Sequence, residues 1–226
     1  MDSQATTTQR TEQITVDVWF DVVCPWCLLG KRRFEAALSH FEHGDAVAVR
    51  WRSFELDPES PGRGELTIPQ RMQRDLGLTP AQAEEKLRVL TELAAEAGLD
   101  YRLTEARPSN SFDAHRLMHY AESVGRGEEM RERLSIAYAT ESAIVSESSV
   151  LVQLATEAGL DDAATRHVLA GGDFSQQVRA DEAQARQLGV TGVPTFVFAQ
   201  RYALSGAQPV ETFHRALTQV WQEATA

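Results

Sequence analysis

Cysteine is scarce in this sequence: only two of the 226 residues are cysteines, and they stand close together as Cys24 and Cys27. A four-cysteine zinc site is therefore excluded, and so is a framework of several disulfides. The pair could supply half of a zinc site, but zinc needs four ligands and the sequence has no second cysteine pair. A structural disulfide across so short a loop would constrain little of the unfolded chain. These observations favour a redox role over either alternative.

Basic charge and long apolar runs are also missing. The chain has 22 Lys and Arg against 33 Asp and Glu, which argues against nucleic acid or an anionic membrane surface as its partner. No apolar run approaches the roughly 18–20 residues of a membrane span. Residues 1–13 lack the apolar segment of a secretory signal, and we expect them to form a flexible tail. We therefore expect a cytoplasmic protein. In a reducing compartment, two cysteines that lie close together more often alternate between dithiol and disulfide than form a permanent structural disulfide.

The two cysteines stand between a strand pattern and a helix pattern. Residues 14–21 alternate between apolar and more polar positions, and a helical run extends from about Cys24 to Glu42. Two residues three apart in the first turn of a helix lie on one face, so the two sulfurs can meet. The free N–H groups and the positive dipole end there favour the thiolate, which is the attacking form. The pattern predicts a dithiol–disulfide catalyst.

The chain on either side of a long middle segment indicates an α/β sheet. A second alternating run begins at Val47, and a parallel pairing with the first strand follows from the helix between them. Near the other end, the run opened by Pro194 is followed after about two residues by a second short run, which predicts an antiparallel hairpin. A final helix is striped by Val210, Phe213, Leu217 and Val220. These elements predict a compact sheet with helices on both faces.

The middle segment, from about residue 67 to 172, has a helical pattern. Thr79 and Gln82 form a capping box at one helix, and further helices fit 127–141, 147–158 and 162–170. Asp173 is expected to cap a helix that runs to about Leu188. Another helix is expected to carry a buried stripe of five residues, Ala114, Leu117, Met118, Ala121 and Val124.

Three features together resemble the thioredoxin fold: the Cys-x-x-Cys helix, the segment Val193-Pro194-Thr195 and the order β-α-β, helices, α-β-β-α. The helical block between the two halves is similar to that of the DsbA class. Three segments resemble the FrnE branch of this class: residues 21–32, 110–117 and 206–209. This resemblance implies an α/β, thioredoxin-like domain at 14–62 and 173–226, with an all-helical insertion at 63–172.

The resemblance also implies roles for individual residues. Cys24 is the attacking thiol and Cys27 resolves the mixed disulfide. Pro194 matches the cis-proline of the family, and Val193 offers its backbone to an extended substrate. The other residues expected to bind substrate are Pro25, Trp26, Asn110 and His115.

Two departures from the family pattern affect the expected chemistry. Trp26 stands where strongly oxidising members carry histidine, so we expect a more reducing couple. Val18 occupies the position of the buried acid that related proteins place beneath the cysteines. Asp17 and Asp21 are the neighbouring acids, and strand parity does not decide which one serves Cys27.

One pair of histidines in the middle segment has three interpretations. His115 and His119 are four residues apart, as helical metal ligands are, but the glutamate of a His-Glu-x-x-His site is missing. His115 either faces the cysteines from the helical insertion or is a half-exposed surface residue. The basic residues Lys31, Arg32, Arg33, Arg50 and Arg52 are interpreted as solvated faces and ion pairs.

The leading interpretation is a thiol–disulfide oxidoreductase or isomerase that acts on protein or small-molecule disulfides and thiols. It needs no cofactor beyond the cysteine pair, with glutathione as a candidate co-substrate. The runner-up is a glutathione-dependent isomerase or transferase of the kappa or hydroxychromene carboxylate isomerase type. These typically carry serine near the position of Cys24 and a Gly-Ser-Asp-Arg turn, where this chain has Gly206-Ala207-Gln208-Pro209. A third interpretation is a non-catalytic partner or chaperone. We expect a monomer or homodimer.

Overall fold

The computed structural model describes residues 13–60, 62 and 64–226 of the chain. The expected tail at 1–13 therefore lies outside the described residues, except for Gln13. The division into domains at residues 62 and 172 stays a prediction. Within the described residues, no helix is both long enough and apolar enough to cross a membrane.

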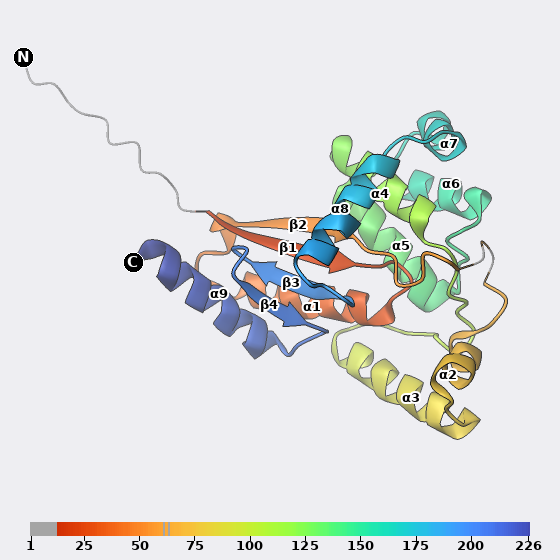
Figure 1. Cartoon of the computed structure of the whole chain (residues 1–226), viewed down its shortest axis with the longest axis horizontal. Coiled ribbons are helices and arrows are strands. Elements are labelled where there is room, and N and C mark those ends of the chain that lie inside the picture. The colour runs from red at the N-terminus through yellow and green to blue at the C-terminus, as the bar shows by residue number, and fades with distance from the viewer. Residues whose placement is uncertain (1–12, 61, 63) are drawn as a thin grey trace, which may run out of the picture.

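A four-stranded sheet forms the centre of the fold, in the order β2-β1-β3-β4 (Figure 1). Strands β1 and β2 are parallel, with Val18 opposite Trp51, whereas β1–β3 and β3–β4 are antiparallel. The predicted parallel pairing and the predicted hairpin are both confirmed. The strand bounds are β1 (Ile14–Phe20), β2 (Val47–Ser53), β3 (Thr195–Phe198) and β4 (Tyr202–Ser205).

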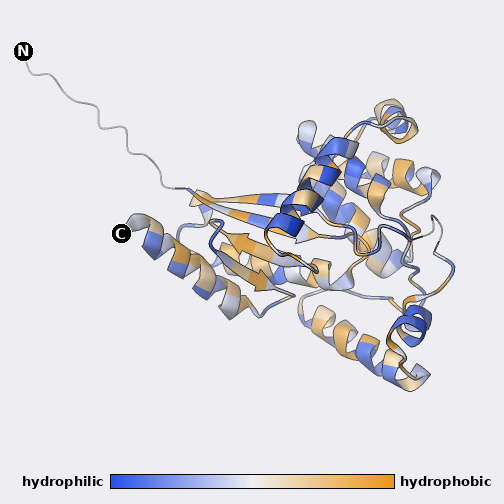
Figure 2. Cartoon of the chain, viewed as in Figure 1, coloured by the Kyte–Doolittle hydropathy of each residue, from blue (hydrophilic) through white to orange (hydrophobic). Residues whose placement is uncertain are grey.

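Helices cover both faces of this sheet. On one face lie α1 (Pro25–Ser39) and α9 (Val210–Thr225), where the rings of Phe34, Phe196 and Phe213 meet with centroids 4.6–5.6 Å apart. Hydrophobic and hydrophilic residues alternate along α9, in keeping with one buried face (Figure 2). On the other face, α8 (Ser175–Gln187) accepts a hydrogen bond of 3.0 Å from the indole of Trp19 at the carbonyl of Asp181.

The chain between β2 and α8 forms helices that complete the core around the start of α1. One large cluster of buried side chains contains both cysteines together with Leu87, Leu117 and Leu134 of the helical segment. The first turns of α1 are therefore enclosed by helices as well as by the sheet. The helices of this segment are α2 (Ile68–Leu76), α3 (Pro80–Glu96), α4 (Phe112–Ser123), α5 (Gly127–Glu141), α6 (Ser148–Glu157) and α7 (Asp162–Ala170), and a short 3₁₀ turn, Gly44–Ala46, precedes β2.

Two local predictions need correction, whereas the capping box of Thr79 and Gln82 is confirmed. Asp173 does not cap α8: the N-cap is Phe174, with φ 63°. The side chain of Arg116 accounts for this, because its Nε donates to the carbonyl of Asp173 at 2.8 Å and fixes that segment outside the helix. Val124 is 52% exposed, because α4 ends at Ser123 and the chain turns away there.

Lys31 forms ion pairs, as expected, but it is buried and does not lie on a solvated face. It is 3% exposed, and its Nζ lies 2.6 Å from Glu35, 2.6 Å from Glu128 and 2.9 Å from Glu132. Arg32 also pairs with Glu132. Because Glu128 and Glu132 belong to α5, this cluster ties the helix of the cysteines to the helical segment.

We expect Glu132→Gln to lower the free energy of unfolding by about 1–3 kcal/mol at pH 7, because a charged hydrogen-bond acceptor is lost. Burial alone would raise the pKa of Glu132, but hydrogen bonds from Arg32 and Lys31 outweigh it and hold the pKa below its usual value. A lowered folded-state pKa gives stability that is present above the usual value and is lost as the pH falls through the folded value. The difference between variant and wild type should therefore shrink below about pH 4, as measured by chemical denaturation.

The matched control is Glu92→Gln, in an exposed pair on α3, which should cost at most ~0.5 kcal/mol. Equal losses in the two variants would contradict this role of the cluster.

Candidate active site

The two cysteines lie in the first turn of α1, as the sequence predicts. Cys24 is the N-cap residue, Pro25 follows at the first helical position, and the amide of Cys27 donates to the carbonyl of Cys24 at 2.9 Å. Both thiols are free and almost buried, with Cys24 6% and Cys27 4% exposed. Trp26, between them, is 41% exposed and forms the outer surface of the site.

The loop before β3 lies directly against Cys24. The Cys24 thiol donates to the carbonyl of Val193 at 3.5 Å, and the Val193–Pro194 peptide bond is cis, the isomer that the resemblance implies. The carbonyl of Pro194 accepts a hydrogen bond of 2.7 Å from the amide of Gly206. The fold thus brings together two segments about 170 residues apart in the sequence.

Asp21 lies beside Cys27, and His115 contacts Asp21. The Asp21 amide donates to the Cys27 sulfur at 3.5 Å, and its carboxylate lies 3.3 Å from Nε2 of His115. Asp21 is 1% and His115 0% exposed, so the surface interpretation of His115 is wrong. Of the two acids that the sequence left open, Asp21 is the one at Cys27, whereas Asp17 binds Arg52 at 2.9 Å.

The buried position of Cys27 determines its protonation. Burial raises the pKa of the Cys27 thiol well above its ordinary value, and the neighbouring Cys24 and the charge of Asp21 raise it further. The hydrogen bond from the Asp21 amide acts in the opposite direction but does not outweigh them. Cys27 is therefore protonated at neutral pH.

Two tyrosines of the helical segment also reach the site, and sequence reasoning missed both. The hydroxyl of Tyr101 donates to the carbonyl of Pro25 at 2.5 Å. Tyr138 is 1% exposed, and its pKa is raised first by burial and then by the charges of Cys24 and Asp21. Neither tyrosine belongs to a motif, and only the tertiary fold reveals them.

The other predicted residues lie outside this cluster. The Asn110 side chain accepts from the Phe112 amide at 3.0 Å at the start of α4, and its amide group lies 3.5 Å from Glu55. These contacts fix the start of the helix that carries His115, and the role of Asn110 in substrate binding stays a prediction. Nε2 of His119 lies 3.1 Å from Asp181, whereas Nε2 of His115 lies 3.3 Å from Asp21, so the two rings contact different acids.

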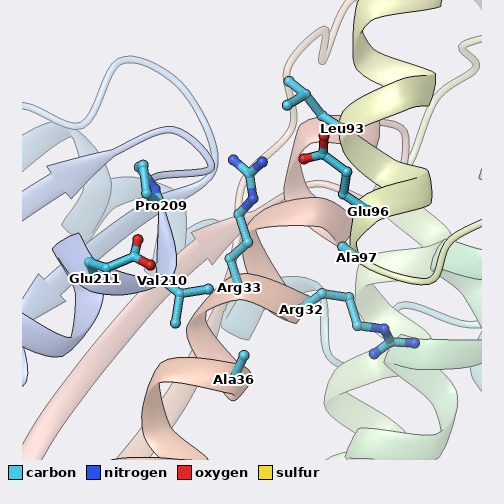
Figure 3. A pocket seen from close by; sticks show the side chains of 9 residues that line it. All are labelled: Arg32, Arg33, Ala36, Leu93, Glu96, Ala97, Pro209, Val210 and Glu211. Atoms are coloured by element: carbon cyan, nitrogen blue, oxygen red, sulfur yellow. The ribbon is translucent and has the colours of Figure 1, made fainter.

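A cavity of about 440 Å³ opens farther along α1, between α1, α3 and the start of α9 (Figure 3). Neither cysteine lines it. Arg33 extends between Pro209 and Glu96, and its guanidinium donates to the carbonyl of Ala207 at 2.8 Å. The hydrogen bond of Arg33 thus fixes the 206–209 turn against α1.

Comparisons with known proteins agree with this arrangement. The DSBA-like thioredoxin domain matches residues 15–218. The chain is 41% identical to a probable DsbA oxidoreductase from Streptomyces coelicolor of known structure, with a TM-score of 0.91 over 93% of this chain and 91% of the other. It is 27% identical to the uncharacterized protein YwbO of Bacillus subtilis (strain 168), over 91% of this chain and 96% of that protein. A 2-hydroxychromene-2-carboxylate isomerase shares the fold, with a TM-score of 0.68 at 17% identity over 93% of this chain and 98% of the isomerase.

We expect Gly30→Ala to lower the free energy of unfolding by about 1–3 kcal/mol, because a core site without room must shift to admit a methyl group. A Cβ at this position would lie 2.9 Å from Cγ of Pro194 and 3.5 Å from Cα of Ala207. Urea denaturation measures the change. Gly172→Ala is the matched control, since a Cβ there meets no atom within 4 Å. A Gly30→Ala variant as stable as the control would show that α1 and the Pro194 loop are loosely packed.

Proposed function

Because the chain belongs to the DSBA-like thioredoxin domain family, we propose that it catalyses thiol–disulfide exchange, with Cys24 attacking the substrate and Cys27 resolving the mixed disulfide. The observation that carries this proposal is the position of the Cys24 thiol, 3.5 Å from the carbonyl of Val193 and at the start of α1. The N-terminus of a helix stabilises a thiolate, and a backbone carbonyl beside it can accept a hydrogen bond from an extended substrate.

The first step is the attack of Cys24 on a substrate disulfide. Cys27 is not the attacking group, because its raised pKa keeps it protonated. When Cys24 ionises, its thiol no longer donates to the carbonyl of Val193, so that carbonyl becomes free to accept from a substrate backbone N–H. The loss of one proton therefore both forms the Cys24 thiolate and frees the carbonyl of Val193.

The second step is the attack of Cys27 on the Cys24 sulfur. This attack forms the Cys24–Cys27 disulfide, and the substrate sulfur leaves with the electron pair of the broken bond while the proton of Cys27 is released, so that the net product is a substrate thiol. The exposed Trp26 ring and the half-buried Pro25 and Val193 offer an apolar surface to the substrate around the reacting sulfur. A thiol reductant restores the two free thiols by reducing the Cys24–Cys27 disulfide.

The fold shared with the isomerase favours one alternative, a glutathione-dependent isomerase or transferase. Two features of the chain count against it: a cysteine at position 24 and the turn Gly206-Ala207-Gln208-Pro209. Titration calorimetry with glutathione tests it. Tight binding that persists in Cys24→Ser, without disulfide exchange in the wild type, would favour the alternative.

We expect Cys24→Ser to abolish the reduction of insulin by dithiothreitol above the uncatalysed rate, because a serine hydroxyl does not attack a disulfide. Turbidity of the released insulin B chain is the measurement. Cys27→Ser is the informative companion, since it should accumulate a mixed disulfide at Cys24 that mass spectrometry detects. Equal rates for wild type and Cys24→Ser would refute the proposal.

A further inference from the structure

Tyr101 connects the helical segment to the peptide group that lies between the two cysteines. It stands in the chain between α3 and α4 and is 4% exposed. Its hydroxyl donates to the carbonyl of Pro25, 76 residues away in the sequence, at 2.5 Å. The backbone beside it is fixed as well, because the amide of Arg102 donates to the carbonyl of Ala139 on α5 at 2.8 Å. A distant hydroxyl donor is thus held on the first turn of α1.

The surroundings of Tyr101 keep its hydroxyl in the neutral form. Burial raises the pKa of Tyr101, and the charges of Cys24 and Cys27 raise it further. A hydrogen bond from the backbone of Leu29 and the charge of Arg32 lower it but do not outweigh these causes. Tyr101 therefore keeps its proton, and its role as a donor, over the pH range in which a cysteine thiol ionises.

One backbone amide at the start of α1 is free to bind the Cys24 sulfur. Cys24 is the N-cap residue, and an N-cap side chain accepts from the amide of the second or third helical residue. The third residue is Cys27, whose amide already donates to the carbonyl of Cys24 at 2.9 Å. The second is Trp26, whose amide has no hydrogen-bond acceptor among the described residues. Because Pro25 has no N–H, the amide of Trp26 is the donor that this turn offers to the sulfur.

The carbonyl that Tyr101 binds and the amide of Trp26 belong to the same peptide group. A hydrogen bond at the carbonyl end polarises that group and makes its N–H a stronger donor. In a helix the N–H points toward the open N-terminus, which is where Cys24 lies. When the Cys24 thiol ionises, its sulfur stops donating to Val193 and becomes an acceptor for this amide.

We propose that Tyr101 is a positioning residue for the attacking cysteine, because it strengthens the amide of Trp26 that binds the Cys24 thiolate. The proposal rests on the exchange function proposed above and adds how the attacking group is stabilised. Tyr101 acts through the peptide group of Pro25 and Trp26 and does not itself react. The helical segment, which carries Tyr101, then contributes to the reactivity of a sulfur on the thioredoxin-like part of the chain.

Other titratable groups also act on the two cysteines. Cys24 and Cys27 act on each other within α1, and Tyr138 of α5 faces Cys24. Asp21 acts on Cys27 and Tyr138, and Arg71 of α2 acts on Tyr138. The hydroxyl of Tyr138 has no hydrogen-bond partner among the described residues. Of the two tyrosines, Tyr101 is therefore the one that a hydrogen bond connects to the turn of the cysteines.

The test measures the pH at which Cys24 becomes reactive. Reduced protein is alkylated with iodoacetamide at a series of pH values, and mass spectrometry of its peptides follows Cys24 and Cys27 separately. Because the thiolate is the attacking form, the rate at Cys24 rises with pH, and the midpoint of this profile reports its ionisation. The wild type is compared with Tyr101→Phe. Tyr120→Phe is the matched control: it removes the same hydroxyl from a ring that packs against the same core cluster, beside Phe174.

We expect Tyr101→Phe to raise the midpoint by about 0.5 pH unit, which is about a threefold loss of thiolate at any pH well below the midpoint. Above the midpoint the variant should react as fast as the wild type or slightly faster, because a more basic thiolate is the better nucleophile. Tyr120→Phe should keep the wild-type midpoint. Circular dichroism checks that each variant is folded.

Four results would overturn the account. An unchanged midpoint in Tyr101→Phe would refute the inference. A lower rate at every pH with the same midpoint would assign Tyr101 a purely structural role and refute it as well. An equal shift in Tyr120→Phe would trace the effect to general loosening of the core. A wild type in which Cys24 does not react would instead refute the exchange function, and the inference with it.

A second measurement needs no variant of Tyr101 and decides alone should Tyr101→Phe fail to fold. The amide proton of Trp26 is followed by nuclear magnetic resonance in the reduced wild type as the pH is raised. It should move downfield with the same midpoint as the alkylation rate, because the amide then donates to a thiolate. The shift should be absent in Cys24→Ser. A Trp26 amide that does not respond to the ionisation of Cys24 would refute the inference.

Discussion

The enclosure of the first turns of α1 is the constraint on which the rest of the structure depends. On one side lies the loop of Val193 and Pro194, with the Cys24 thiol on its carbonyl. On the other side lie the helices of the inserted segment, which share one hydrophobic cluster with both cysteines. Because protein interiors are close-packed, neither side can move without disturbing the sulfurs. The helical segment is thus part of the site, through His115, Tyr138 and Tyr101, as well as a cover over it.

Buried charges tie the same layers together. Lys31 joins α1 to α5, and Arg52 joins β2 to Asp17 of β1 and Asp181 of α8. Removing one partner of such a pair leaves an uncompensated charge, which costs more than the pair contributes. These contacts therefore favour one arrangement of the helical segment over others. The position of the two thiols between the sheet and the helical segment depends on that selectivity.

Periodicity made the frame predictable, whereas two of the features that it did not predict depend on contacts between residues far apart in the sequence. The helix predicted at 127–141 is observed at Gly127–Glu141, and the parallel and antiparallel pairings are confirmed. The start of α8 was missed because a distant residue, Arg116, holds the backbone at Asp173. The choice between Asp17 and Asp21 was undecidable from strand parity, because β1 ends at Phe20 and Asp21 lies beyond it. The contact of His115 with Asp21 spans 94 residues, and no spacing rule records it.

The fold does not decide the function by itself, as the isomerase of similar architecture shows. What distinguishes this chain is a pair of sulfurs in unequal surroundings. The Cys24 thiol contacts the carbonyl of Val193, whereas the Cys27 sulfur contacts the buried amide of Asp21. A single nucleophile at position 24 would need no second, buried thiol beside it. The burial and raised pKa of Cys27 suit a thiol that reacts second, and they support the two-thiol exchange proposed above over chemistry at Cys24 alone.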